Sequence, residues 1–290
     1  MIPLTLRDRL AEHLGAEVRR VEPVVGGCIA RACRVETGAG TYFLKWGRGD
    51  VARTFWAEAD GLQALREAGA PLIVPEVLVL GDADDATPGF LLMAWIEPGP
   101  PRDGFWEALA HGLVALHRHT APRYGYDEDN YLGRSVQHND WQATWPAFFR
   151  ACRLAPQVRR AREQGRWQRR WDRPLERLYE RLPELLPERP ETSLVHGDLW
   201  HGNVMTTAAG PPALIDPAVY FGHREVDLAM TELFGGFDPA FYEAYRAAWP
   251  LEPGYEERRE VYNLYHLLNH LNLFGAGYAG SIDEVLRRYA

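Results

Sequence analysis

Hydrophobic residues recur along this chain with two different periods, and the order of these periods predicts how its elements are arranged. Apolar side chains fall at helical spacing in residues 3–15, 51–68, 103–119 and 262–274. Alternating or short apolar runs in residues 18–25, 29–35, 41–46, 77–80 and 90–96 predict strands. Strands therefore gather in the first third of the chain and helices in the remainder, which predicts an α+β protein.

The stretch LVHGDLWHGN, residues 194–203, carries the densest candidate chemistry. Asp198 and Asn203 have the spacing of a kinase catalytic loop, in which the Asp accepts a hydroxyl proton and the Asn helps to hold Mg²⁺. Thirteen residues later an apolar strand ends at Asp216, where a second metal ligand is expected. Turn and cap hydrogen bonds are the alternative role for either loop residue alone. The combination favours phosphoryl transfer.

A single lysine, Lys45, stands among arginines as the only lysine of the chain. Nucleotide bias in the source genome explains the arginines, but an ammonium and a guanidinium are not interchangeable, so the remaining lysine marks a place where shape matters. Its strand is the third, where a kinase places the lysine that grips the α- and β-phosphates. Glu58, on the next predicted helix, is the expected ion-pair partner; a solvated carboxylate is the alternative.

Two further segments fit a nucleotide site less specifically. Gly26, Gly27 and Cys28 lie between the first two strands, where free amides face a phosphate or simply close a hairpin. The segment EPGPP at 97–101 ends the last strand and predicts lobes at 1–96 and 97–290, with a hinge at about 94–98. In a kinase architecture the adenine would meet the backbone of the preceding residues, Met93, Ala94, Trp95 and Ile96. A linker without a ligand is the alternative.

Composition limits the partners that we expect. Hydrophobic residues make up 46% of the 290 residues, charged residues 25%, and the net charge is −8. Such a surface repels phosphate backbones, so we expect no nucleic-acid partner. No apolar run is long enough to span a membrane, the first residues do not resemble a signal peptide, and the three cysteines lack metal-ligand spacing. We expect a cytoplasmic protein without a membrane partner, and a monomer is compatible with the sequence.

With these motifs in place, the chain resembles the fructosamine kinase (ketosamine-3-kinase) family, within the aminoglycoside phosphotransferase and choline kinase branch of the protein-kinase-like fold. The segments that carry the resemblance are GGCI at 26–29, HGDLWHGN at 196–203, IDPAVY at 215–220, EVDLAMTELFGGF at 225–237 and LLNHLN at 267–272. Residues 124–127 with Asn130, and residues 145–154, add to it. The chain departs from the family at 30–32, where the family more often has a polar residue.

The resemblance implies two lobes, an N-terminal antiparallel sheet with a helix and a mostly helical C-terminal lobe. It also implies ATP- and Mg²⁺-dependent phosphorylation of a sugar hydroxyl, at position 3, on a glycated amine, which labilises the adduct and regenerates the amine. An aminoglycoside or amino-alcohol kinase is the alternative enzyme. A non-catalytic nucleotide-binding regulator is the alternative of another class, but such proteins typically lack one of the polar elements present here.

Several residues are assigned further roles. Trp200, His201 and Asp140 are candidates for the acceptor site, and the aromatic 124–141 segment is expected to be a long irregular loop. Asp227 is expected to cap a helix at 228–234, to brace the catalytic loop, or both. Cys28 is a candidate redox-sensitive thiol, with an inert core residue as the alternative. The histidines at 111, 117 and 119 are interpreted as core or surface residues.

Overall fold

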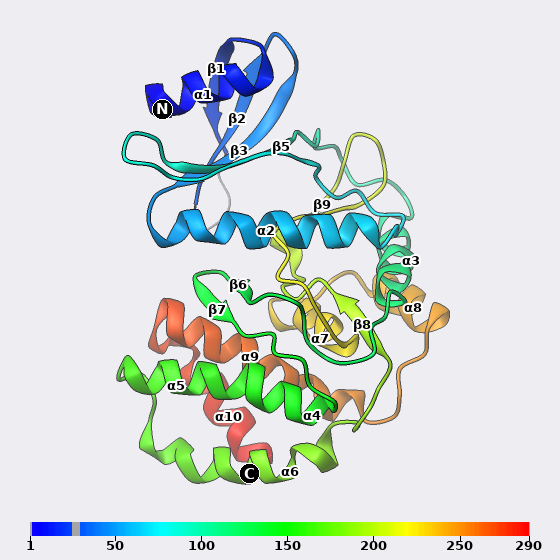
Figure 1. Ribbon diagram of the computed structural model, residues 1–290. Coiled ribbons are helices and arrows are strands. Elements are labelled where there is room, and N and C mark those ends of the chain that lie inside the picture. The colour runs from blue at the N-terminus through cyan, green and yellow to red at the C-terminus, as the bar shows by residue number, and fades with distance from the viewer. Residues whose placement is uncertain (1, 25–29, 290) are drawn as a thin grey trace.

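The computed structural model of this protein describes residues 2–24 and 30–289, and it has a sheet-containing part above a larger helical part (Figure 1). A five-stranded antiparallel sheet has the order β1-β2-β3-β5-β4. Its strands are β1 (Val18–Pro23), β2 (Arg31–Thr37), β3 (Thr41–Gly47), β4 (Val77–Gly81) and β5 (Gly89–Ala94). Helix α1 (Leu4–Leu14) covers one face, and the long helix α2 (Asp50–Glu67) lies below the other.

Side-chain alternation along β3 decides which face of the sheet Lys45 occupies. Leu44 and Trp46 are buried against α1, in the cluster that also contains Leu6 and Leu10. Successive side chains of a strand point to opposite faces, so Lys45 points toward α2 and the helical part. It pairs with Leu91 of β5, which packs in the same core cluster as Phe55 of α2.

Helices dominate the chain after the sheet. They are α3 (Phe105–His117), α4 (Trp145–Phe148), the π-helix η1 (Phe149–Leu154), α5 (Ala155–Glu163), η2 (Arg169–Trp171), α6 (Asp172–Leu185), α7 (Glu225–Leu233), α8 (Pro239–Ala248), α9 (Tyr255–Phe274), η4 (Ala276–Tyr278) and α10 (Ala279–Tyr289). Three short antiparallel pairs lie among them: β6 (Asn130–Leu132) with β7 (Ser135–Gln137), β8 (Thr192–Val195) with β11 (Tyr220–His223), and β9 (Val204–Met205) with β10 (Ala213–Leu214). The 3₁₀ turn η3 (His201–Asn203) leads from the 194–203 motif into β9.

Two large apolar cores hold these layers together. One lies within the helical part, among α4, α5, α6, α9 and α10. The other continues from α2 and β5 through α3 to α7 and α8, so it joins the sheet to the helices. Burial of this shared apolar core stabilises the packing of the two parts against each other. The site described below lies where they meet.

The predicted α+β class, with an antiparallel N-terminal sheet and a mostly helical C-terminal lobe, is confirmed, but local predictions failed. Asp103 does not cap α3, because Gly104 occupies the N-cap in a left-handed conformation. The predicted irregular loop at 124–141 contains the β6–β7 hairpin. Asp227 lies inside the first turn of α7, which begins at Glu225, and is not its cap.

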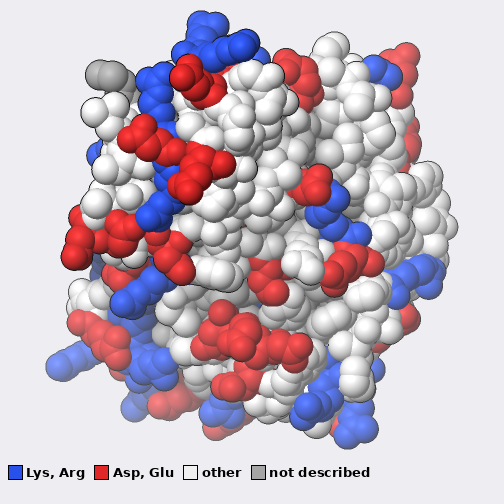
Figure 2. All heavy atoms as spheres, turned by 45° about the horizontal axis from the view of Figure 1, so that its top comes forward, with Lys and Arg blue, Asp and Glu red and all other residues white. Residues whose placement is uncertain are grey.

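The molecular surface mixes both signs of charge. On the face shown in Figure 2, acidic and basic side chains are interspersed, with several acidic groups near its centre. Among residues 2–24 and 30–289, no helix combines the length and the apolar character that crossing a bilayer requires.

Candidate active site

Lys45 joins the sheet to the helical part of the site through two carboxylates. Its Nζ donates to Glu58 Oε1 at 2.7 Å and to Asp216 Oδ1 at 2.5 Å. The side chains of Lys45 and Glu58 are mostly removed from water, at 11% and 14% exposure. Burial alone lowers the pKa of Lys45, but the carboxylates of Glu58 and Asp216 outweigh it and raise this pKa, so the ammonium stays charged. The predicted lysine–glutamate pair is therefore formed, with the second acid beside it.

The catalytic motif brings Asp198 and Asn203 into contact. Asn203 donates from Nδ2 to the main-chain oxygen of Asp198 at 2.7 Å and to Asp198 Oδ2 at 3.1 Å. Their spacing allows this contact because residues 201–203 form a 3₁₀ turn that folds the chain back. The Asn203 side chain is thereby fixed by its amide nitrogen, and its carbonyl Oδ1 accepts no hydrogen bond from the described residues.

Removal from water, together with the nearby carboxylates of Asp216 and Asp227, raises the pKa of Asp198 to about 7. The hydrogen bond from Asn203 opposes this shift. A carboxylate with a pKa near neutrality is a better proton acceptor than an ordinary aspartate, because it holds the proton more strongly once it is transferred. The geometry and the pKa therefore suit a general base.

Asp227 holds the backbone at the start of the loop that contains Asp198. Its carboxylate accepts from the amides of His196 at 2.7 Å and Gly197 at 2.9 Å. His117 of α3 contacts the same carboxylate at 3.1 Å. The sequence did not distinguish His117 from its neighbours His111 and His119. Only the spacing of the apolar residues on α3 could have indicated that position 117 faces the interior.

Gly197 is required by the same arrangement. Its φ is +81°, and a Cβ there would lie 2.0 Å from the carbonyl oxygen of Ala218. The loop therefore approaches the segment that follows Asp216 as closely as a backbone can.

Asp216 lies at the end of a two-stranded ribbon that sets it beside Asn203. Leu214 of β10 pairs with Val204 of β9, and the amide of Ile215 donates to the Asn203 carbonyl at 3.1 Å. Asp216 has φ +53°, a left-handed conformation that a non-glycine residue seldom adopts. Backbone strain of this kind is common at functional sites. Here it turns the carboxylate, 36% exposed, toward Lys45.

The donor set of this site fits a hard cation. Magnesium prefers oxygen ligands and commonly takes one or two carboxylates together with phosphate and water oxygens. Asp216 offers a partly exposed carboxylate, and Asn203 offers the carbonyl oxygen left free by its contact with Asp198. Within the described ranges no group of three His, Cys, Asp or Glu side chains could hold a metal alone. A metal here would therefore depend on oxygens from the nucleotide.

The predicted adenine-binding segment comprises the last two residues of β5 and the two residues that follow it. Met93 is buried in the core shared by both lobes, and the Ala94 amide donates to the Glu76 carbonyl at 2.9 Å. The side chain of Trp95 turns to Glu97 and stacks on Phe43. The amides of Trp95 and Ile96 donate to no backbone carbonyl of the described residues, so they are the ones available to a purine edge. Gly26, Gly27 and Cys28 lie outside the described residues.

The acceptor candidates lie in different surroundings. Trp200 is 39% exposed, packs edge-on against Phe234, and covers Gly202, where a Cβ would lie 2.4 Å from the indole. His201 is bonded through Nε2 to the Gly236 carbonyl at 2.6 Å and packs on Phe237, so its ring anchors η3 to the loop after α7. The Asp140 side chain is exposed, and its backbone carbonyl accepts from Cys152 Sγ.

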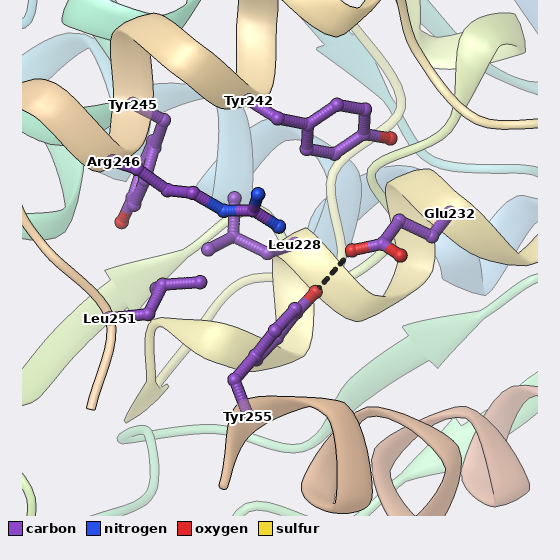
Figure 3. Close-up of a pocket in the computed structure, with 7 residues that line it drawn as sticks. All are labelled: Leu228, Glu232, Tyr242, Tyr245, Arg246, Leu251 and Tyr255. Carbon is purple, nitrogen blue, oxygen red and sulfur yellow. Dashed lines mark hydrogen bonds between the residues drawn. The ribbon is translucent and has the colours of Figure 1, made fainter. Parts of the chain in front are cut away.

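A hollow between α7, α8 and the start of α9 does not belong to this site. It is lined by Leu228, Glu232, Tyr242, Tyr245, Arg246, Leu251 and Tyr255 (Figure 3). The Tyr255 hydroxyl donates to Glu232 Oε1 at 2.6 Å across it, and no space for a water molecule is left. It is a packing defect between helices, without room for a ligand.

Comparison with known sequences gives consistent matches over almost the whole chain. The sequence model of the fructosamine kinase family matches residues 4–290. A probable ketoamine kinase of Enterococcus faecium is 42% identical over 271 residues, which cover 93% of this chain and 95% of that protein. A chloroplastic protein-ribulosamine 3-kinase of Arabidopsis thaliana is 34% identical and is matched over 96% of this chain and 86% of its own length.

Comparison with solved structures agrees. A putative fructosamine-3-kinase from Haemophilus somnus superposes with a TM-score of 0.87 at 27% identity, over 98% of this chain and 96% of that one. An aminoglycoside phosphotransferase, solved with ADP and hygromycin B, gives a TM-score of 0.70 at 18% identity over 99% of both chains. The second likeness concerns the fold alone, and it confirms the predicted protein-kinase-like architecture.

Proposed function

Because this chain belongs to the fructosamine kinase family, we propose that it transfers the γ-phosphoryl group of ATP to the 3-hydroxyl of a ketosamine. The observation that carries the reaction type is the joint placement of two groups. A base, Asp198, contacts Asn203, and Asp216 contacts the buried ammonium of Lys45. This places a proton acceptor, two oxygen ligands and a fixed cation in one site, which is what phosphoryl transfer to a hydroxyl requires.

Nucleotide binding is assigned to the sheet side of the site. Lys45, held by Glu58, exchanges its contact with Asp216 for the α- and β-phosphates of ATP. The free amides of Trp95 and Ile96 receive the adenine. Asn203 Oδ1 and the Asp216 carboxylate would hold Mg²⁺, which would neutralise charge on the phosphate oxygens.

The transfer step uses Asp198. Its carboxylate, which has the raised pKa described above, hydrogen-bonds the 3-hydroxyl of the acceptor and takes its proton. The hydroxyl oxygen forms a bond to the γ-phosphorus while the bond from that phosphorus to the β-phosphate oxygen breaks, and ADP leaves. Asp227 keeps the loop amides fixed during this step, so the base does not have to be reoriented.

The acceptor class rests on the relatives rather than on the geometry. They are named ketoamine kinase and protein-ribulosamine 3-kinase. The exposed indole of Trp200, two residues from the base, offers a flat face to a sugar or to a cationic amine. An aminoglycoside or amino alcohol is less well supported, since the phosphotransferase likeness is one of fold.

Turnover across acceptor classes tests this function. ADP release is measured with ATP and Mg²⁺ for fructosamine and ribulosamine adducts of small amines and of lysine, for kanamycin and for choline, with Asp198→Asn as the inactive control. We expect turnover of the ketosamines only, and phosphorus NMR should locate the phosphate on the third sugar carbon. Efficient turnover of choline or kanamycin without the ketosamines would show that the acceptor assignment is wrong.

A further inference from the structure

Arg153 is an ionised side chain that is buried without an ionised partner among the described residues. Its exposure is 0%, and its guanidinium donates only to neutral oxygens, the carbonyls of His138 at 2.6 Å and Cys152 at 3.0 Å and Asn139 Oδ1 at 2.9 Å. Its Nε has no hydrogen-bond partner among the described residues. Burying a charge is costly unless it is paired. A residue with this cost needs a compensating role.

Aromatic rings supply part of the compensation. The guanidinium carbon lies 3.8 Å from the ring centroid of Tyr220, 4.5 Å from that of Phe148 and 5.6 Å from that of Tyr265. Contacts of a cation with ring faces are favourable and strengthen when water is excluded. Arg153 also belongs to the π-helix η1, a widened turn that is frequent at functional sites and seldom formed elsewhere.

On one side, Arg153 fixes the loop that contains the acceptor candidate Asp140. The two residues it binds, His138 and Asn139, are also held by Asp129, which accepts from the Asn139 amide at 2.8 Å and contacts His138 Nδ1 at 2.7 Å. The segment 138–140 is therefore held by two side chains, the buried donor Arg153 and the carboxylate of Asp129. The backbone of Asn139 is held independently by the Tyr126 amide, but no other described side chain donates to the His138 carbonyl or to Asn139 Oδ1, so Arg153 alone ties these two oxygens to the π-helix.

A second set of buried hydrogen bonds, made by Gln137 and Asn130, reaches the segment that follows Asp216. Gln137 donates from Nε2 to the Ala218 carbonyl at 3.0 Å and to Asn130 Oδ1 at 2.7 Å. Asn130 donates to the Val219 carbonyl at 2.7 Å. Ala218 in turn donates its amide to the His196 carbonyl of the catalytic loop at 2.8 Å. Gln137 thus binds the backbone at a position only two residues after Asp216.

Tyr265 of α9 links the two halves. Its hydroxyl donates to Gln137 Oε1 at 2.8 Å, and its ring is the third one near the Arg153 guanidinium. Asn130, Gln137, Arg153 and Tyr265 are all buried and form one continuous unit, here called the polar block. The β6–β7 hairpin that supplies two of its members lies between α2 and the helices around α5 in Figure 1.

We propose that Arg153 and Gln137 are positioning residues, which through the polar block fix the acceptor-side loop 138–140 against the segment that follows Asp216. The inference rests on the proposed function, since it assigns loop 138–140 to the ketosamine. Its consequence is that the acceptor side is set relative to the base and the metal ligands before substrate binds. Small displacements of a reacting group are costly in rate, so a buried cation is retained where it prevents them.

The test compares Arg153→Met with a matched control, Arg150→Met. Arg150 belongs to the same π-helix but is exposed, with its guanidinium 4.7 Å from the Tyr179 ring. For Arg153→Met we expect kcat/KM for the ketosamine to fall by on the order of 10²-fold, because the loop loses its fixed position. KM for MgATP should stay near the wild-type value, because the loop oxygens that Arg153 binds lie on the acceptor side. Methionine leaves no charge in the buried site, but the oxygens that Arg153 served lose their donor, so the melting temperature should fall.

Amide hydrogen exchange provides a second readout that needs no substrate. The Asn139 amide should exchange faster in Arg153→Met and at the wild-type rate in Arg150→Met. If Arg153→Met does not fold, Arg153→Lys replaces it, since an ammonium keeps the charge but cannot bridge two acceptors in the planar fork of a guanidinium. The same selective loss for the acceptor is expected.

Coupling within the polar block is measured with Gln137→Leu. The effects of Arg153→Met and Gln137→Leu on kcat/KM should be less than additive in the double variant, because both disconnect the same loop. Equal losses for MgATP and ketosamine, strict additivity, or kinetics and exchange of Arg153→Met equal to those of Arg150→Met would each overturn the inference. A wild-type enzyme that phosphorylates no ketosamine would contradict the proposed function instead, and the exchange rates would still decide whether Arg153 fixes the loop.

Discussion

The ammonium of Lys45 lies 2.5 Å from Asp216 Oδ1, so the residue expected to grip phosphate contacts the residue expected to hold the metal. The contact joins the third strand of the sheet to the end of β10, 171 positions further along the chain. It neutralises a carboxylate whose charge would otherwise act on Glu58 and Asp198. Under the proposed function, the nucleotide and the metal would replace this internal ion pair.

Substitution of Lys45 by arginine should lower kcat/KM by on the order of 10²-fold, equivalent to about 2.7 kcal/mol of transition-state stabilisation. Lys45 Nζ fits between Glu58 and Asp216 at 2.7 and 2.5 Å, and a planar guanidinium is too large to occupy that point. Steady-state kinetics and circular dichroism of Lys45→Arg check this. A folded variant with near-normal turnover would contradict the assignment.

The two acids of the site should fail in different ways. Asp198→Asn should lower kcat by roughly 10²–10⁴-fold, the usual contribution of a general base, and leave MgATP affinity close to that of the wild type. Asp216→Asn should weaken nucleotide binding in the presence of Mg²⁺, because it removes a metal ligand. Calorimetric titration of both variants with ATP, with and without Mg²⁺, separates the roles. Identical loss of binding in the two would argue against this division.

Activity should depend on pH through Asp198. Because its pKa is raised to about 7 and only the carboxylate can accept a proton, kcat/KM for the ketosamine should rise with pH up to about 7 and then level off. The sign for stability is opposite. Since the folded protein binds this proton more strongly than the unfolded chain, stability is lost as pH rises from the ordinary aspartate range through about 7.

Two measurements check the pH prediction. The pH profile of kcat/KM should show an acid limb with a midpoint near 7. Thermal unfolding of Asp198→Asn should be shifted upward relative to the wild type at pH above this midpoint and less so well below it, because asparagine does not ionise. A flat stability difference across that range would show that Asp198 has an ordinary pKa.

Truncation of the exposed indole should affect the acceptor. Trp200→Ala should raise KM for the ketosamine about tenfold, since loss of an aromatic or cation–π contact costs roughly 1–1.5 kcal/mol. KM for ATP should change much less, because Trp200 packs on Phe234 and Gly202 in the helical part, whereas the nucleotide is assigned to the sheet side of the site. Phe274→Ala, at another exposed aromatic residue, is the control for nonspecific loss of apolar surface. Equal effects on both substrates would assign Trp200 to loop packing.

Much of the site could be predicted from local sequence, for a physical reason in each case. Asp198 and Asn203 meet because five residues with a 3₁₀ turn bring them together, so their spacing is itself the geometry. Lys45 points away from Leu44 and Trp46 because strands alternate. Glycine at 197 follows from the closeness of the loop to Ala218, although sequence alone could not show what it approaches.

Other features were decided only when distant segments packed. Glu58 was one of many acids on helices until α2 placed it against Lys45. His201 was a candidate for the acceptor site, and in the structure its ring is bonded to the Gly236 carbonyl in the loop after α7. No local pattern distinguished Arg153 from the other arginines around it, and Gln137 lies in the segment that was predicted to be irregular. Both are buried in the tertiary structure. The β6–β7 hairpin that contains Gln137 packs on the segment after Asp216, where Gln137 binds the Ala218 carbonyl.

The sequence by itself therefore determined the class of fold and the family, and it predicted the candidate reactive groups, because these depend on periodicity and on short spacings within single elements. The tertiary structure alone decided which charges are paired, which are buried, and which residues hold the reactive groups in place. Burial and pairing are properties of contacts between elements far apart in the chain, and the same arginine or histidine has opposite energetics on a wet surface and inside a core.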